Sequence, residues 1–407
     1  MKITVLGDIM CEPAVLNPAK QSDGSYDFNP LFSQVKGMIA EADYTIANLE
    51  MPLAGEEVGY THSFYVFNAP DSMADAVKNA GIDLVSTANN HTFDRGMEGA
   101  VRTLKVLDDK GISHTGSYAP GTPREGAFYF EIDGTKFAVL AYTYGTNYNK
   151  NDWRNVLAEG EYAGTVNLLH PRSMGVYLPG VYRDPDWVDK AFKKIIPDEE
   201  RRGRLKIWLG MQGNYPRADD NLVEEMMAPY MDQLQNDIRE AKQKADVVIA
   251  YPHMGGQFNE TPGAITRHVV GKCLEAGADA IMAGHSHCVQ KMEMLGQVPC
   301  AYSIGNFSMC PYSSLMVQER LPGYGLAIHL YVEDKKIVKT TFSILKAVQK
   351  RGEQLISWPV DKLYPALKSE KERQKLLQEV TQIYTTVTGK APGEEIIRGE
   401  YNFPAEI

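Results

Sequence analysis

Short apolar runs of β-strand character alternate with segments of helical periodicity along most of the chain. The strands are predicted at residues 3–6, 44–47, 84–87, 137–142, 247–251, 280–283 and 301–304. Helical patterns lie between them, for example at 97–110 and 268–276. Strands that alternate with helices predict an α/β fold.

The later part of the chain adds other patterns. Two apolar runs, 326–332 and 340–345, flank a turn-like Glu-Asp-Lys-Lys and predict a β-hairpin. A helical stripe covers 222–244, where Pro229 is expected to cause a kink, and a charged amphipathic helix is predicted at 366–384. Residues 146–222 are rich in Tyr, Trp, Asn, Pro and Gly and have weak periodicity, so they are expected to form an excursion or cap.

Polar residues follow most of the predicted strands, at the point where each strand ends. These residues are Asp8, Glu50, Asn89, Asn90, His91, Asp94, His253, His285, His287 and Asn306. Because ligands bind at the C-terminal ends of strands in open α/β sheets, we expect Asp8, Glu50, Asn90, His253, His285 and His287 to converge.

Carboxylates, an amide and imidazoles are the ligand set of Mn, Fe(II) or Zn. Each residue alone has an ordinary structural explanation. An Asp after a strand is often a turn or helix cap, paired Asn residues tolerate turn geometry, and a lone buried His is often structural. The sequence predicts a metal centre because so many of these residues directly follow strands.

Composition narrows the function. The net charge of −10 argues against a nucleic-acid-binding protein, which would carry a basic face. The five cysteines, at 11, 273, 288, 300 and 310, lack metal-pair spacing. The sequence contains no signal peptide and no apolar stretch long enough to span a membrane, so reduced thiols and a cytoplasmic location are expected.

Gly7-Asp8, Asn90-His91, His253 and the Gly-His-x-His at 284–287 resemble the calcineurin-like metallophosphoesterase superfamily. The stretches "GDIM", "NLE", "ANNHTFDRG", "EAGADAIMAGHSH" and "YSIGNF" are similar to CapA-type proteins of poly-γ-glutamate (capsule) synthesis. The resemblance implies a four-layer α/β/β/α sandwich. It also implies one domain over 1–345, with 346–407 as a C-terminal helical extension.

The resemblance also implies roles for the site residues. Glu50 would bridge two metal positions. One position would use Asp8, Glu50 and His287, and the other Glu50, Asn90, His253 and His285. His91 would be the general acid or base, and Asp94 would orient it or cap the following helix.

Two positions depart from the superfamily pattern. Met10 occupies the place of a usual His ligand, and Glu50 stands where the superfamily usually has Asp. We therefore expect one tight metal site and one weaker site.

The predicted activity is metal-dependent hydrolysis of a phosphoester or glutamyl-peptide-like substrate by a metal-bound water, with Mn, Fe or Zn as the ion. The alternatives are a metal-dependent peptide epimerase, in which Asp8 and His91 move the proton, and a non-catalytic binding or assembly protein of capsule biosynthesis. We expect an anionic or peptide-like substrate and no nucleic-acid partner. The candidates for substrate contacts are His62, Asn89, Ser303 and Asn306.

Overall fold

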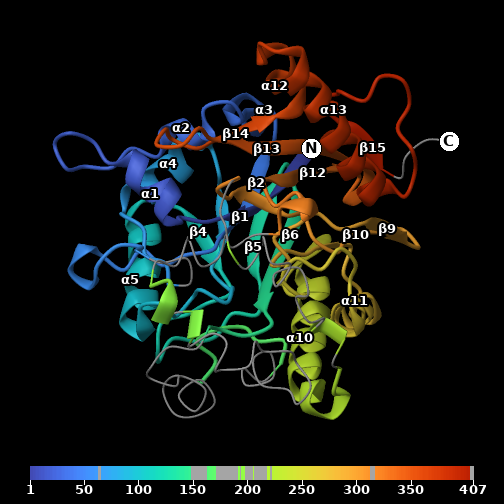
Figure 1. Cartoon of the computed structure of the whole chain (residues 1–407). Helices are drawn as coiled ribbons and strands as arrows, with labels where there is room; N and C mark the ends of the chain where they lie inside the picture. Colours follow the sequence, from blue (N-terminus) through green and yellow to red (C-terminus); the bar gives the residue numbers. More distant parts are fainter. Residues whose placement is uncertain are drawn as a thin grey trace.

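The structure is a computed structural model that describes residues 1–62, 66–147, 163–170, 191–192, 194–197, 205, 218–220, 222–311 and 317–403. Two β-sheets form its centre, and helices cover their outer faces (Figure 1). The predicted four-layer α/β/β/α arrangement is confirmed.

The first sheet has the order β14-β13-β12-β1-β2-β3-β4, and β11 and β15 pair with β1 and β13. Its strands are β1 (Lys2–Ile9), β2 (Tyr44–Leu49), β3 (Leu84–Ser86), β4 (Ser113–Thr115), β11 (Asn306–Ser308), β12 (Tyr324–Glu333), β13 (Lys336–Val348), β14 (Ile356–Pro359) and β15 (Tyr401–Phe403). Strand β1 runs antiparallel to β12 along its first half and pairs in parallel with β11 from Asp8 onward. This change of partner brings Asn306 beside Asp8.

The second sheet has the order β5-β6-β7-β8-β10-β9. Its strands are β5 (Phe128–Ile132), β6 (Thr135–Thr143), β7 (Val247–His253), β8 (Ala280–Met282), β9 (Met292–Leu295) and β10 (Val298–Ala301). Strands β6, β7 and β8 are parallel, so their C-terminal ends share one edge.

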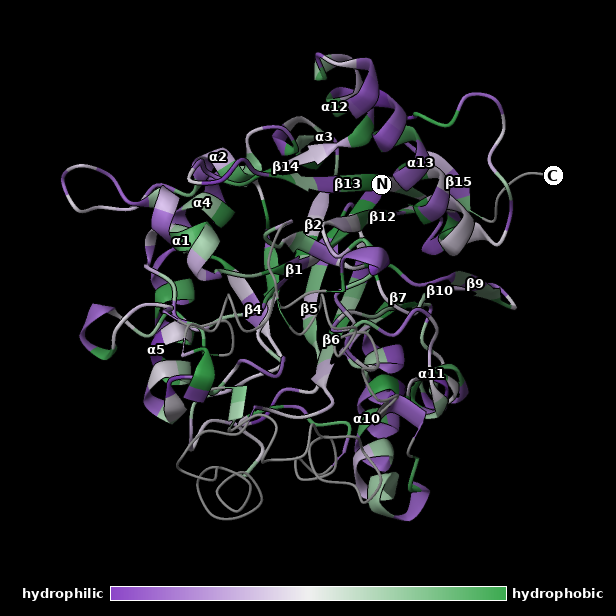
Figure 2. Ribbon diagram, in the orientation of Figure 1, coloured by the Kyte–Doolittle hydropathy of each residue, from purple (hydrophilic) through white to green (hydrophobic). Residues whose placement is uncertain are grey.

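The helices follow the apolar faces of the sheets. They are α1 (Pro13–Ala19), α2 (Asn29–Phe32), α3 (Lys36–Ala40), α4 (Ser72–Ala80), α5 (Gly96–Asp109), α10 (Glu224–Lys244), α11 (Ala264–Ala276), α12 (Val360–Ala366) and α13 (Glu370–Thr388). Three buried clusters fill the layers: the first sheet against α1 to α5, the space between the sheets, and the second sheet against α10 and α11. Figure 2 shows hydrophobic colour along the central strands and hydrophilic colour on the outer faces of the helices.

Burial of Ile3 and Val5 from the first sheet against Phe137 and Val139 from the second holds the two sheets together. Fully burying such side chains stabilises the fold by about 1.5–3 kcal/mol each. This packing fixes the two sheets relative to each other, and the predicted site residues lie at the C-terminal ends of their strands.

Most predicted elements are present with shifted ends. Strand β10 begins three residues before the predicted 301–304 because residues 298–301 pair with β9. Helix α13 begins after Ser369, which forms a capping box with Glu372, so it starts later than the predicted residue 366. The predicted excursion at 146–222 falls mostly outside the described residues, and so does its suggested role as a cap.

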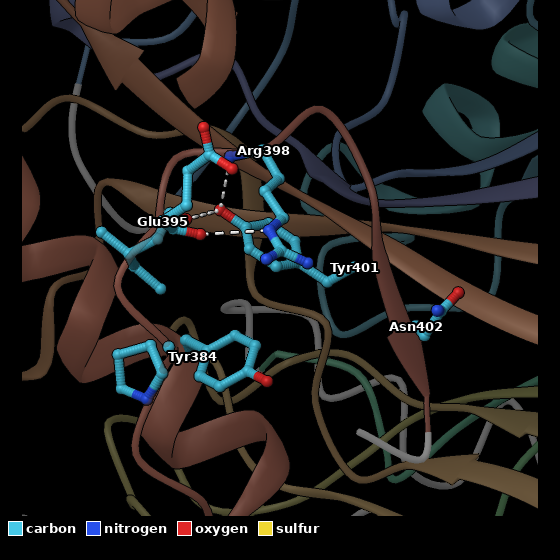
Figure 3. Close-up of a pocket in the computed structure, with 8 residues that line it drawn as sticks. Tyr384, Glu395, Arg398, Tyr401 and Asn402 are labelled. Atoms are coloured by element: carbon cyan, nitrogen blue, oxygen red, sulfur yellow. Dashed lines mark hydrogen bonds between the residues drawn. The ribbon is translucent and has the colours of Figure 1, made fainter. Parts of the chain in front are cut away.

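The C-terminal part is not purely helical, contrary to the expectation for 346–407. Besides α12 and α13, it supplies β14 and β15 to the first sheet. The sequence signal was weak because both strands have at most four residues. A surface pocket in this part is lined by residues that include Tyr384, Glu395, Arg398, Tyr401 and Asn402 (Figure 3). None of the predicted site residues lines this pocket.

In the part of the chain that the structure describes, no helix has the length and apolar character needed to cross a lipid bilayer.

Candidate metal centre

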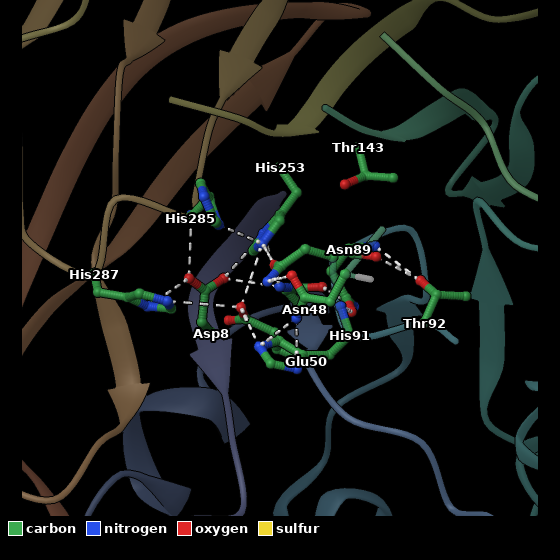
Figure 4. A network of polar contacts seen from close by, with 12 residues as sticks. Asp8, Asn48, Glu50, Asn89, His91, Thr92, Thr143, His253, His285 and His287 are labelled. Carbon is green, nitrogen blue, oxygen red and sulfur yellow. Dashed lines mark hydrogen bonds and ion pairs between the residues drawn. The ribbon is translucent and has the colours of Figure 1, made fainter. Parts of the chain in front are cut away.

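Both sheets contribute to one polar cluster at the C-terminal ends of their strands (Figure 4). From the first sheet, Asp8 lies in β1, Glu50 directly follows β2, and Asn90 follows β3. From the second sheet come three histidines, of which His253 ends β7 and the others follow β8. All six predicted metal ligands are buried: Asp8, Glu50, Asn90, His253, His285 and His287.

Two groups of ligand atoms in the cluster are close enough to hold an ion. Asp8, Glu50 and His253 each offer an atom within 4.8 Å of the others, and so do Glu50, His285 and His287. Ligands to one transition-metal ion lie about 2.0–2.2 Å from it, and therefore up to about 4 Å from each other. Glu50 belongs to both groups, as a bridging carboxylate would. The division of the histidines between two metal positions stays a prediction.

The carboxylate of Glu50 is the clearest indication of a cation-binding site. Both of its side-chain oxygens are buried and, within the described part of the chain, neither receives a hydrogen bond. Burial, together with the nearby charge of Asp8, raises the pKa of Glu50 to about 8. A buried carboxylate that accepts no hydrogen bond is costly, and a metal ion held by Glu50 and the nearby histidines would compensate its charge.

Two of the three histidines, His253 and His285, are held in the neutral state that metal binding requires. Burial lowers the pKa of His253 to about 4, and burial together with His253 and His287 lowers the pKa of His285 well below its usual value. The Nε2 of His253 lies 2.8 Å from Oδ1 of Asn90 and 3.3 Å from Oε1 of Glu50. The Nδ1 of His285 lies 3.2 Å from the same Nε2.

The backbone after β8 is shaped to bring these groups together. His285 and His287 have φ values of 91° and 53°, which are uncommon for residues other than glycine. A Cβ atom on Gly284 would lie 2.9 Å from Oδ1 of Asp8. Glycine at 284 therefore allows the close approach, and the amide of His285 donates to Oδ2 of Asp8 at 3.2 Å.

His91 stands beside the cluster with its ring fixed from two sides. Its Nδ1 donates to Oδ2 of Asp94 at 2.5 Å, and its ring stacks on Phe67 with a centroid separation of 4.2 Å. Its Nε2 lies 4.0 Å from Oε1 of Glu50. Burial opposes the charged form, but the charge and hydrogen bond of Asp94 outweigh it, so the pKa of His91 is raised.

Asp94 therefore orients His91. It also accepts a hydrogen bond from the amide of Phe67 at 2.7 Å. Among the described residues, the Asp94 side chain accepts no hydrogen bond from the first turn of α5. The sequence had also allowed Asp94 to be a cap of this helix.

Two asparagines that the sequence reasoning did not assign take part in the cluster. Asn48 donates to Oδ1 of Asp8 at 2.8 Å, and its Nδ2 lies 3.2 Å from Nδ1 of His253. Asn147 bonds Asn90 twice, through its backbone amide to the Asn90 carbonyl and through its Oδ1 to Nδ2 of Asn90. Asn48 could have been identified from the sequence, because it is a polar residue inside the apolar strand before Glu50. Asn147 follows a strand end without a distinctive motif.

The predicted substrate contacts occupy different places. Asn89 donates to Oδ1 of Asn48 and to the carbonyl of Leu49, so it stabilises the cluster through Asn48. Ser303 is buried and its hydroxyl accepts from the amide of Gly305 at 3.3 Å. His62 is exposed, with Nδ1 3.4 Å from the carbonyl oxygen of Tyr60. Their contact with substrate stays a prediction.

Asn306 lies next to the cluster, and its Oδ1 is 2.9 Å from Nδ1 of His287. Met10 is buried in the hydrophobic cluster between the first sheet and its helices. Residue 10 therefore offers the site no nitrogen or oxygen ligand from its side chain.

Comparison with known proteins gives the family. The profile described as "Bacterial capsule synthesis protein PGA_cap" matches residues 2–310. The chain belongs to this family. The predicted CapA-type relationship is thereby confirmed.

Three relatives from bacteria are distant in sequence. The capsule biosynthesis protein CapA of Bacillus anthracis is 22% identical over 75% of this chain, and the PGA biosynthesis protein CapA of Bacillus subtilis is 21% identical over the same share. An uncharacterised protein, y4uA, of Sinorhizobium fredii is 24% identical, also over 75% of this chain. The matched region spans only 59, 63 and 65% of these three relatives, respectively.

Solved structures with a similar course of the chain are more distant still. A hypothetical protein from Thermus thermophilus aligns over 85% of this chain and 99% of its own, with 15% identity and a TM-score of 0.43. A putative 5'-nucleotidase from Staphylococcus aureus aligns over 93% of this chain and 58% of its own, with 13% identity and a TM-score of 0.42. Similarity at this level supports no functional inference.

Proposed function

We propose that this member of the capsule synthesis family is a metal-dependent hydrolase. The observation that carries the proposal is the buried carboxylate of Glu50, which accepts no hydrogen bond from the described residues and lies close to His253, His287 and a His91–Asp94 pair. The substrate would be a phosphoester or a glutamyl-peptide-like amide, in keeping with the poly-γ-glutamate ("PGA") name of the B. subtilis relative.

The donor set fits a divalent Mn, Fe or Zn ion because it combines carboxylate, amide and imidazole groups without thiolates. Asp8, Glu50 and His287 would hold one ion, and Glu50, Asn90, His253 and His285 another. When bound, such an ion would acidify a water molecule and polarise the bond to be cleaved. The first position would be the weaker one because Met10 packs in the core.

His91 would move the proton. Asp94 accepts from Nδ1, which leaves Nε2 facing the cluster as the atom that donates a proton to the leaving group. Phe67 holds the ring in plane by stacking, and the raised pKa keeps a protonated fraction at neutral pH. The His91 ring is largely shielded from bulk solvent, since the residue is only 5% exposed.

Replacement of His91 tests the proposal. In His91→Gln protein loaded with Mn, Fe(II) or Zn, turnover of aryl phosphodiesters, aryl phosphomonoesters or γ-glutamyl anilides should fall about 10²–10⁴-fold, because the general acid is lost. The metal content should stay unchanged. His114→Gln is a matched control, since His114 also pairs with an aspartate, Asp108, at 3.1 Å. Equal activity in the His91→Gln protein and wild type would overturn the proposed role.

A binding or assembly role without turnover is the second candidate, favoured by the names of the CapA relatives. In that case the metal-loaded wild type would bind poly-γ-glutamate chains, and the His91→Gln protein would bind them equally well. The epimerase alternative would show itself as solvent deuterium entering the α-carbon of a peptide without cleavage.

A further inference from the structure

Both the nitrogen and the oxygen of the Asn306 side chain make polar contacts within the protein. It opens β11 beside Asp8 in the parallel register and is 2% exposed. Its Nδ2 donates to the carbonyl oxygens of His287 and Pro322 at 3.0 and 2.9 Å, and lies 3.1 Å from the sulfur of Met309. Its Oδ1 lies 2.9 Å from Nδ1 of His287.

These contacts fix the orientation of the amide. The carbonyl oxygens of His287 and Pro322 can only accept hydrogen bonds, so the group that faces them must be the NH₂. The oxygen of Asn306 then faces Nδ1 of His287 and can only accept. The proton of the neutral imidazole must therefore reside on Nδ1.

This tautomer leaves the lone pair on Nε2 of His287. That nitrogen lies 3.8 Å from Oε1 of Glu50, a separation that two ligands of one transition-metal ion can have. The nearest carboxylate oxygen to Nδ1, Oδ2 of Asp8, is 3.9 Å away and beyond hydrogen-bond distance. Among the described residues, Asn306 is thus the group that selects the tautomer.

The same amide also holds an unusual backbone. His287 has a φ of 53°. This backbone conformation is energetically unfavourable for a residue other than glycine. The bond from Nδ2 of Asn306 to the His287 carbonyl restrains this conformation. Side chain and backbone of one histidine are therefore both fixed by one residue.

We infer that Asn306 is a positioning residue for the metal centre: it presents Nε2 of His287 as the metal-binding atom and holds the backbone that aims it. The inference rests on the proposed metal-dependent function and assigns Asn306 a different task from the substrate contact expected from the sequence. Mutation of a residue that hydrogen-bonds to a metal-binding histidine commonly lowers the metal affinity about 10–100-fold.

The tautomer can be measured on the wild-type protein. In ¹⁵N NMR of the metal-free wild type near neutral pH, Nδ1 of His287 should be protonated and Nε2 unprotonated, with the signals assigned from the spectrum of a His287→Gln variant. Protonation of Nε2 with a bare Nδ1 would overturn the inference. Neither this readout nor metal affinity depends on turnover, so both remain informative if the hydrolase proposal fails.

Variants give the second test. Asn306→Ala should bind Mn or Zn about 10–100-fold more weakly than wild type in calorimetric titration, and the His287 signals should show a mixture of tautomers. Asn306→Asp keeps an acceptor at Nδ1, so it should retain the Nδ1–H tautomer and bind metal more tightly than the alanine variant. Asn167→Ala is the matched control, because Asn167 is equally buried and bonds Tyr118 and Ala141. Wild-type metal affinity and tautomer in a folded Asn306→Ala variant would contradict the inference.

Discussion

A single residue, Glu50, accounts for much of the chemistry of the site. Its carboxylate is fully buried near Asp8, and neither of its oxygens has a hydrogen-bond donor within the described chain. Water cannot compensate for such a charge, so without an ion the group is neutralised by a proton instead. The residue therefore links metal binding to protonation.

This linkage predicts how the stability of the metal-free protein depends on pH. The pKa of Glu50 is about 8 in the folded chain and 4.5 for the unperturbed group, so between these values the folded state keeps a proton that the unfolded state has lost. Stability should therefore fall as pH rises toward about 8. The best window is about pH 7.5 to 8, because there His253, with a folded pKa of about 4 and an unfolded pKa of about 6.5, is largely neutral in both states.

Denaturant unfolding in the presence of a chelator measures this effect. Glu50→Gln should flatten the fall in stability within the window, since the amide does not titrate. Glu12→Gln is the comparison, because burial raises the pKa of Glu12 to about 7 and its contribution ends near that pH. Identical pH dependence in the wild type and the Glu50→Gln variant would show that Glu50 does not titrate as described.

At the scale of the elements, the site depends on how closely strand ends approach each other. The turn after β8 brings Gly284 against the carboxylate of Asp8 in β1, and Gly7 of β1 lies against the carbonyl of Gly305 before β11. A Cβ on Gly7 would be 2.1 Å from that oxygen. Small residues at these crossings bring candidate ligands from two different sheets close together.

Gly284→Ala should weaken metal binding about tenfold or more, comparable to the loss of a group that orients a ligand. The added methyl would lie 2.9 Å from Oδ1 of Asp8 and displace that carboxylate. Gly271→Ala, in the middle of α11, is the control, because its new methyl would meet no atom within 4 Å and alanine favours the helix. Calorimetric metal titration of both variants decides the matter, and equal affinity in the two would contradict the role given to Gly284.

At the scale of the whole molecule, two sheets packed face to face bring together residues that lie up to 279 positions apart in the sequence, from Asp8 to His287. The sequence was sufficient to predict this convergence, because Asp8, Glu50, Asn90 and the histidines each lie near or just after the C-terminal end of an apolar strand, and such strand ends meet at one edge. The apolar interior runs of β1, β2 and β7 likewise predicted the sheets with errors of only a few residues.

The rest depended on contacts that no local pattern encodes. The short strands β14 and β15 exist because they pair with β13, which lies far away in sequence from residue 401. Tertiary packing places Asn147 against Asn90 and orients the Asn306 amide toward His287. Residue types at strand ends could be predicted, whereas the hydrogen bonds between them required the structure.

The metal centre is the central claim of this account, and metal content per chain tests it most directly. Elemental analysis of protein purified without chelator, and again after incubation with Mn, Fe(II) or Zn, should find at least one such ion per chain in the wild type. The Glu50→Gln variant, which loses the carboxylate common to both ligand groups, should retain substantially less. A wild type that holds no metal under either condition would contradict the account and leave a family member that works without a metal centre.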